Sequence, residues 1–344
     1  MVHDMIGDTT VCTFSLYGTQ VRVTMASALL ADPVIELLKH FRSERSEHDE
    51  AVSLSLHAVA DRTEVPLILS PTASRLSSGT GEGINGRPAT GLSYDVWKDG
   101  DRLLADFHRA GALLMEPRRG QADIYLVSPE SMHANLIEYL FHLALIELLR
   151  VRGLYTIHAT ALERHGRGVL IPGNSGRGKT TSFVSLLRSG YRYLSDDHPL
   201  IQDVGSHVDV LPFPIKINVT DATVSFFPEL QNAPAGVLRP GLGKRSFDAE
   251  AIYSASIGER CRPTIVLFPN VVDSPRSDLE LLPKSRALEA LLPQALLVYD
   301  REVARREFQV LAKLVQQVDC YRLHFGRNIL DLPALISPLL DQAR

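Results

Sequence analysis

Polar and apolar residues alternate near the start of the chain, and the period of the pattern changes further along. From residue 13 to 25 the apolar positions are Phe14, Leu16, Val21, Val23 and Met25. Alternation of this kind is typical of strands with one buried face, so it predicts two strands joined by a turn at residues 17–19. A helix is expected over 32–42, and strands over 52–58, 67–70 and 122–127. The pattern over residues 1–129 therefore predicts a small, mostly β module of α+β type.

A long loop is expected over residues 71–93, which are rich in Ser, Gly, Thr and Pro. Within it, Gly81-Glu82-Gly83-Ile84-Asn85-Gly86 matches the G-x-G-x-x-G pattern of dinucleotide sites. A true site of that kind opens a helix, and no amphipathic helix follows here. The stretch is therefore interpreted as a surface loop, for which a role in facing the substrate stays open.

The period becomes helical after Ser128-Pro129, where apolar residues recur every three or four positions up to Arg152-Gly153. This pattern predicts a long helix that opens a second domain, residues 130–344. Strands are then expected over 154–157, 169–171, 191–194, 264–268 and 321–325. Helices are expected after residue 179 and over 285–292, 303–318 and 329–340. The first domain would serve substrate recognition or oligomerisation.

A glycine loop lies between an apolar strand and an amphipathic helix in the second domain. It satisfies G-x-x-x-x-G-K-[ST], the phosphate-binding P-loop pattern. In such a loop, backbone N–H groups converge on phosphate oxygens at a helix N-terminus. The lysine would reach the β- and γ-phosphates, and the following threonine would bind Mg2+. The candidate nucleotide-binding residues are Gly173, Asn174, Ser175, Gly176, Arg177, Gly178, Lys179, Thr180 and Thr181.

Two further elements stand near the loop. Asp196 and Asp197 follow a short predicted strand, and ligands bind outside the carboxyl ends of parallel strands, so both acids should face the phosphates. One carboxylate could hold metal while the other accepts a proton from an attacking hydroxyl. His158 lies fifteen residues before Gly173, and a hairpin between them would return it to the site. A solvated turn and a core histidine are the structural alternatives.

Composition limits what the loop can serve. The chain has 344 residues, 45% of them hydrophobic, with a formal net charge of −4 and a pI near 6.3. This balance leaves no basic patch for nucleic acid or an anionic membrane, so neither is expected as a partner. The start of the chain lacks the pattern of a signal peptide. Cys12, Cys261 and Cys320 are widely spaced, which predicts reduced thiols in a cytoplasmic protein.

The combination of His158-Ala159, GNSGRGKT at 173–180 and YLSDD at 193–197 resembles the catalytic core of the bacterial HPr kinase/phosphorylase family. The resemblance covers roughly residues 130–340. It implies an α/β fold similar to phosphoenolpyruvate carboxykinase, with the P-loop on a mostly β core flanked by helices. It also implies ATP and Mg2+ as cofactors and transfer of phosphate to a serine hydroxyl. Relatives are often hexameric, so a homo-oligomer is expected.

The resemblance assigns roles that spacing alone leaves open. It implies that Asp197 is the general base, while Asp196 and His158 shape the site and Lys179 contacts the phosphates. With Thr180, Asp196 would bind the metal. These four residues, Asp197, Asp196, His158 and Lys179, are the candidate catalytic set.

One departure from the family lies downstream. The HPr enzymes carry an E-x-R-G signature, but here no glutamate precedes the arginine in Leu238-Arg239-Pro240-Gly241. A second metal ligand and the reverse phosphorylase reaction are therefore in doubt. The chain resembles divergent HPr-kinase-like proteins, a group that includes kinases of ribosomally made precursor peptides such as lasso peptides.

Cationic side chains that could hold the transferring phosphate follow the acidic pair. Lys216, Lys244 and Arg245 are the candidates, with solvated surface charge as the alternative. The expected function is Mg-ATP-dependent transfer to serine on a protein or peptide, which would be the partner. A small-molecule hydroxyl kinase and a non-catalytic ATP-sensing module remain the alternatives. The acidic pair with His158 favours an enzyme, because a sensor needs no base.

Overall fold

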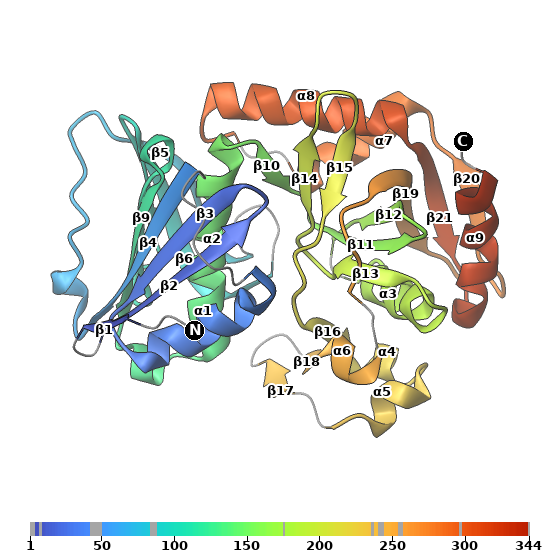
Figure 1. Cartoon of the computed structure of the whole chain (residues 1–344), viewed down its shortest axis with the longest axis horizontal. Coiled ribbons are helices and arrows are strands. Elements are labelled where there is room, and N and C mark those ends of the chain that lie inside the picture. Colours follow the sequence, from blue (N-terminus) through green and yellow to red (C-terminus); the bar gives the residue numbers. More distant parts are fainter. Residues whose placement is uncertain are drawn as a thin grey trace. The chain divides into compact units, whose positions relative to one another are not determined.

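A computed structural model describes residues 4–6, 9–41, 50–82, 88–174, 176–234, 237–239, 244–253, 257–295 and 298–342. The chain divides into two compact units, Met1–Arg152 and Gly153–Arg344 (Figure 1). Both contain multi-stranded sheets flanked by helices, so the predicted α/β class is confirmed.

The first unit is built on a nine-stranded sheet with the order β1-β2-β3-β4-β9-β8-β7-β6-β5. Strand β4 runs parallel to β3 and β9, and the other neighbours are antiparallel. Helices α1 (Ala28–Leu37) and α2 (Ala134–Val151) pack together. The strands are β1 (Asp4–Ile6), β2 (Thr9–Leu16), β3 (Thr19–Met25), β4 (Glu50–Val59), β5 (Ser74–Glu82), β6 (Pro88–Asp99), β7 (Arg102–Asp106), β8 (Gly111–Glu116) and β9 (Gln121–Val127).

The predicted hairpin near the start is confirmed as β2 and β3. Its turn residues Tyr17 and Gly18 both have positive φ, 51° and 86°. Positive φ at both central residues matches the right-handed twist of the flanking strands. The helix expected over 32–42 overlaps α1 and a short 3-10 turn, η1 (Lys39–Phe41). The strands expected over 52–58 and 122–127 are β4 and β9.

Two expectations for the first unit are wrong. Residues 67–70 form no strand: instead, Ser70 donates from its backbone N to Asp99 Oδ2 at 3.1 Å. The stretch 71–93 contains the paired strands β5 and β6 rather than one long loop. In this antiparallel pair, Arg75 lies over the ring of Trp97. Residues 83–87, which carry most of the G-x-G-x-x-G pattern, lie outside the described residues.

The division between the units falls after Arg152, whereas the sequence placed it near residue 130. Helix α2 packs against β8, β9 and α1, so its long apolar face is buried in the first unit. A short 3-10 turn, η5 (Pro129–Ser131), precedes the helix. The boundary drawn at 130 had assigned this helix to the second domain.

The second unit is built on a mixed six-stranded sheet with the order β13-β11-β12-β19-β21-β20. Two three-stranded sheets, β10-β14-β15 and β16-β18-β17, accompany it. The strands are β10 (Leu154–Thr156), β11 (Ala159–Arg164), β12 (Arg167–Pro172), β13 (Arg192–Ser195), β14 (Leu200–Asp203), β15 (Val208–Leu211), β16 (Ile217–Thr220), β17 (Val237–Arg239), β18 (Lys244–Phe247), β19 (Arg262–Val271), β20 (Asp278–Leu281) and β21 (Asp319–Phe325).

Helices cover the six-stranded sheet. Helix α3 follows β12, and α8 packs against β15, β19 and β21. The helices are α3 (Lys179–Arg188), α4 (Asp221–Val224), α5 (Pro228–Asn232), α6 (Ala249–Ile252), α7 (Lys284–Leu291), α8 (Arg301–Gln317) and α9 (Leu332–Gln342). The strands and helices expected in the tail of the chain are confirmed as β19, α7, α8, β21 and α9, the last preceded by η7 (Ile329–Asp331).

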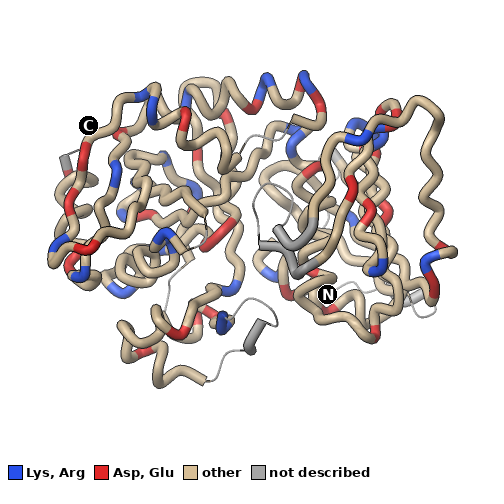
Figure 2. The backbone as a smooth tube through the Cα atoms, turned by 180° about the vertical axis from the view of Figure 1, so that it is seen from behind, with Lys and Arg blue, Asp and Glu red and all other residues tan. Residues whose placement is uncertain are grey.

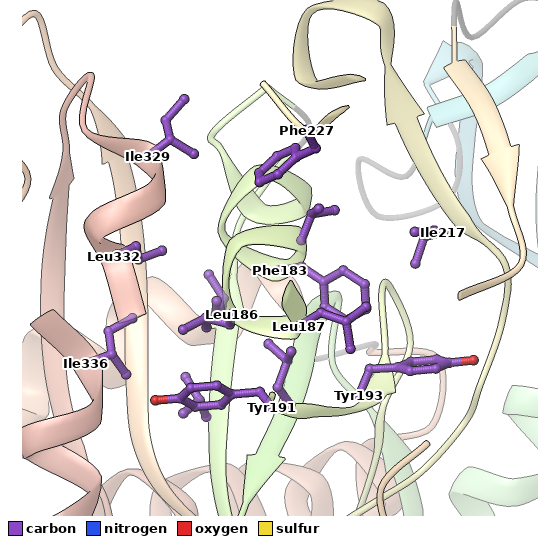
Figure 3. Close-up of a cluster of buried hydrophobic side chains, with 14 of the residues drawn as sticks. Phe183, Leu186, Leu187, Tyr191, Tyr193, Ile217, Phe227, Ile329, Leu332 and Ile336 are labelled. Carbon is purple, nitrogen blue, oxygen red and sulfur yellow. The ribbon is translucent and has the colours of Figure 1, made fainter. Parts of the chain in front are cut away.

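The main core of the second unit surrounds α3. From this helix Leu186 lies toward Leu332 and Ile336 of α9, and Phe183 lies on the other side, toward Tyr193 and Ile217 (Figure 3). Buried apolar side chains of this size each stabilise a fold by about 1.5–3 kcal/mol. The helix that follows the glycine loop is therefore fixed by packing on more than one side.

Strand directions bring the motif-bearing ends together. Strand β11 is antiparallel to both β12 and β13, so the start of β11 lies beside the ends of its two neighbours. Ala159 pairs with Pro172, and Ala161 pairs with Ser195. His158, the glycine loop and the acidic pair therefore all lie next to strand ends on the same side of this sheet.

Charges are interspersed along both units, with blue and red segments alternating in each (Figure 2). Within the described part of the chain, no helix combines the length and apolar character required to cross a bilayer.

Candidate active site

The glycine loop joins β12 to α3. Gly178 caps the helix with φ of 89°, a left-handed conformation that side chains rarely adopt. A Cβ atom at this position would lie 2.8 Å from Cδ1 of Phe325, so both the turn and the packing require glycine. Ser175 lies outside the described residues. The loop therefore presents the N-terminus of a well-packed helix, as a phosphate site needs.

Lys179 is buried and directed into the site. Its Nζ atom donates to the carbonyl of Gly173 and lies 2.9 Å from Nε2 of His158. Oδ1 of Asp197 is 4.0 Å away. Burial lowers the pKa of Lys179, although the charges of the two aspartates oppose that shift.

Asp197 lies between two imidazoles. Nε2 of His158 is 3.0 Å from Oδ1, and Nε2 of His198 is 3.3 Å from Oδ2. Burial alone would raise the pKa of Asp197. The two imidazoles and Lys179 outweigh burial, and the pKa is held well below its ordinary value. The side chain is 34% exposed, which leaves room for a reactant to approach the carboxylate.

Asp196 occupies a different environment, with only 5% of its surface exposed. The hydroxyl of Thr160 is 3.3 Å from Oδ1 and also donates to the Asp196 carbonyl at 2.8 Å. The backbone N of Asn218 donates to Oδ2 at 3.2 Å. Burial, together with the neighbouring negative charge of Asp197, raises the pKa of Asp196 to about 6.

Backbone hydrogen bonds tie these segments to one another. The N of Gly173 donates to the carbonyl of His158 at 3.4 Å, and the N of Ala159 donates to the carbonyl of Asp197 at 3.2 Å. The N of His158 donates to the carbonyl of Gln294 at 2.7 Å. The relative positions of the three motifs are thus set by the main chain.

The remaining loop residues have varied surroundings. Asn174 is exposed, and its Oδ1 accepts from the side chain of Gln294 at 3.0 Å. Gly176 and Arg177 are exposed, whereas Thr180 is half-buried in the first turn of α3. The Thr181 hydroxyl is 3.0 Å from that of Thr223, beside α4 rather than in the loop.

The three cationic candidates differ. The charge of Lys244 lowers the pKa of both Asp196 and Lys179. Arg245 instead forms an ion pair with Asp221 at 2.8 Å. Lys216 is exposed, and its carbonyl accepts from the Asn218 side chain. Of the three candidates, Lys244 is therefore the one whose charge acts on site residues.

Sequence reasoning missed three residues. His198 directly follows the acidic pair, and the run Asp-Asp-His was a usable signal. Thr160 and Asn218 gave none, because a hydroxyl in one strand and a backbone N–H in another become neighbours of Asp196 only through the fold.

Comparison with known proteins finds a partial likeness to HPr kinase/phosphorylases. No family model matches the chain. HPr kinase/phosphorylase from Xylella fastidiosa (strain M12) is 35% identical over 82 residues, which are 24% of this chain and 25% of the relative. The protein of the same name from Xanthomonas campestris pv. campestris (strain B100) is 34% identical over 82 residues, with the same coverage of both chains. Over this stretch the chain is similar to HPr kinase/phosphorylases.

The likeness is partial. The chain spans about a quarter of the length of the curated relatives it matches. A solved structure, described as the Hpr(Ser) kinase/phosphatase from Coxiella burnetii, is 14% identical with a TM-score of 0.27. That match covers 54% of this chain and 93% of the other.

Proposed function

We propose that this chain is a Mg-ATP-dependent kinase that transfers the γ-phosphoryl group to a serine hydroxyl of a protein or ribosomally made peptide. One observation carries the proposal: Lys179, His158 and Asp197 meet within 4.0 Å at the N-terminus of a helix that follows a phosphate-binding loop. The names of the partial relatives agree with a kinase.

The loop and Lys179 supply the phosphate-binding part. Backbone N–H groups at the start of α3 favour negative charge. Lys179 is held by the Gly173 carbonyl and His158, and it exchanges these partners for phosphate oxygens. Because the ammonium is already buried, little water has to be removed when the phosphates enter, and its attraction for them is strong.

Asp197 supplies the proton acceptor. Its depressed pKa makes it a weak base before the reaction, so it acts through position. In phosphoryl transfer, the hydroxyl proton is accepted as the phosphoryl group moves, and an oriented carboxylate suffices. The serine hydroxyl approaches the part of the Asp197 carboxylate that is exposed.

We expect Asp196 and Thr180, with Asn218, to hold a divalent cation. Among the described residues, no group of three or more His, Cys, Asp or Glu side chains is placed to hold a metal ion. Mg2+ is usually held by one or two carboxylates together with substrate phosphates. The buried Oδ1 atom of Asn218 has no hydrogen-bond partner, and its backbone N contacts Asp196. When bound, the ion supplies positive charge to the phosphate oxygens.

The acceptor and assembly belong to the same proposal. The E-x-R-G glutamate is absent, so we expect an acceptor other than HPr and weak or no phosphorolysis. The first unit serves substrate recognition or oligomer contacts, and the second unit is the catalytic part. We expect a cytoplasmic homo-oligomer that binds neither nucleic acid nor membranes, in keeping with the interspersed positive and negative residues along the chain (Figure 2).

The test uses the full chain, γ-labelled ATP with Mg2+, and serine-containing peptides encoded beside its gene, with purified HPr as a further acceptor. The expected result is label on a peptide serine, which Lys179→Ala abolishes. If the protein binds ATP and labels no peptide, HPr or small hydroxyl compound, the kinase proposal fails. An ATP-sensing module then explains the loop better.

A further inference from the structure

The carboxylate of Asp197 is held at both of its oxygens, each by a different imidazole. His158 contacts Oδ1 at 3.0 Å, and His198 contacts Oδ2 at 3.3 Å. The two rings lie 6.3 Å apart between centroids and are inclined by 33°. A carboxylate accepts and cannot donate, so each ring nitrogen must carry a proton while it makes this contact.

The two imidazoles are not equivalent. Nε2 of His158 also lies 2.9 Å from Nζ of Lys179. One ring nitrogen cannot donate to Asp197 and accept from an ammonium group at the same time. The contact of His158 with Asp197 therefore depends on where Lys179 is, and Lys179 must move toward phosphate when the nucleotide binds.

His198 comes from a fixed segment. Its backbone N donates to Oγ of Ser195 at 3.0 Å, and the residue is only 9% exposed. The carbonyl of the next residue, Pro199, accepts from the N of Ile157 at 3.3 Å. Hydrogen bonds of the main chain at residues 198 and 199 therefore fix the segment that carries the His198 ring.

Orientation matters because the terminal torsion of an aspartate is broad. A base must present a lone pair within hydrogen-bond reach of the hydroxyl, and a small misplacement can cost about a hundredfold in rate. We propose that His198 is a positioning residue, which holds Oδ2 so that the Asp197 carboxylate keeps one orientation whether or not Lys179 occupies Nε2 of His158. This inference rests on the proposed kinase function.

The experiment compares His198→Leu, which removes the donor and keeps the bulk, with His198→Gln, whose amide can donate from nearly the same place. In His198→Leu we expect kcat for the labelled serine peptide to fall about tenfold to a hundredfold, with KM for ATP unchanged. His198→Gln should recover most of that loss. The matched control is His207→Leu, because His207 also contacts an aspartate, Asp209, at 2.9 Å.

A second readout does not need an acceptor. In protein with 15N-labelled histidine, the Nε2–H resonance of His198 should be protected from exchange and should shift in Asp197→Ala, while that of His207 stays in place. An unshifted His198 resonance overturns the inference. So does a full kcat in a folded His198→Leu protein when wild type is active. If wild type itself transfers no phosphate, the kinase proposal fails instead, and the inference falls with it.

Discussion

Asp196 and Asp197 are adjacent in sequence, yet the regions around them are opposite in character. Asp196 is almost fully buried, accepts from neutral donors, and has a pKa raised to about 6. Asp197 is a third exposed and faces two imidazoles and an ammonium, which hold its pKa well below the ordinary value. The difference shows that adjacent residues at a strand end can meet two environments. It supports the proposal that one carboxylate binds a cation and the other accepts from a hydroxyl.

The largest expected effect is on catalysis by Asp197→Asn. The amide cannot accept the hydroxyl proton, so kcat for the serine peptide should fall about 10²–10⁴-fold, while ATP affinity changes little. Asp196→Asn should instead raise the Mg2+ concentration needed for half-maximal activity. Initial rates measured against peptide, ATP and Mg2+ separate the two. Equal losses of kcat with unchanged Mg2+ dependence in both variants would break the comparison.

Stability in metal-free buffer should depend on pH through Asp196. Its pKa is higher in the fold than the ordinary 3.8, so the folded protein binds the proton more tightly and the stabilising contribution is present at low pH. That contribution is lost as pH rises from about 4 through about 6, by up to about 3 kcal/mol. Asp196→Asn should remove this part of the profile.

Denaturant unfolding with EDTA at pH 4.5 and pH 7.5 measures the effect. The control is Asp209→Asn, because Asp209 is also a buried aspartate and contacts His207 and Arg260. If the stability of wild type and of Asp196→Asn depends on pH in the same way, the fold does not shift the pKa of Asp196.

Thr160→Val tests the neutral donors around Asp196. The valine keeps the shape, but the hydroxyl that donates to the Asp196 carbonyl at 2.8 Å is lost, which leaves a buried acceptor without that partner. The free energy of unfolding should fall by about 1–3 kcal/mol. Equilibrium urea unfolding measures it, and Thr160→Ser should restore most of the loss. If Thr160→Val leaves the free energy of unfolding unchanged, the Thr160 hydroxyl does not stabilise the Asp196 segment.

Lys244→Ala should give the smallest effect. The charge of Lys244 lowers the pKa of Asp196, so its removal should raise that pKa further and move the pH-dependent loss of stability upward. We also expect about a tenfold lower kcat if the ammonium holds the transferring phosphate. Arg245→Ala is the matched control, because its exposed pair with Asp221 contributes about 0–1 kcal/mol. Equal shifts in the two variants would argue against a special role for Lys244.

Much of this arrangement could be predicted from sequence because it depends on local signals. The glycine loop, its strand and its helix follow from a pattern of adjacent residues, and the hairpin at Tyr17-Gly18 follows from alternation and turn chemistry. The strand pair β5 and β6 was missed because small polar residues weaken the usual strand signal.

The partners of Asp196 could not be foreseen for a different reason. Thr160 and Asn218 lie 36 and 22 positions away from it. The pairing of β11 with β13 brings Thr160 close, whereas Asn218 comes from a separate sheet, β16-β18-β17. The pKa difference between the two acids likewise depends on burial and on His198, neither of which spacing reveals. The placement of α2 depended on which sheet its apolar face covers, and its sequence fits either unit.

The main-chain bonds that join His158, Gly173 and Asp197 have a practical consequence. Since the frame of the site is made by backbone groups, replacing a reactive side chain should leave the frame standing. A full-length Asp197→Asn protein should then retain ATP and its acceptor without consuming either. Such a variant is a bait with which the natural acceptor can be captured from cells and identified.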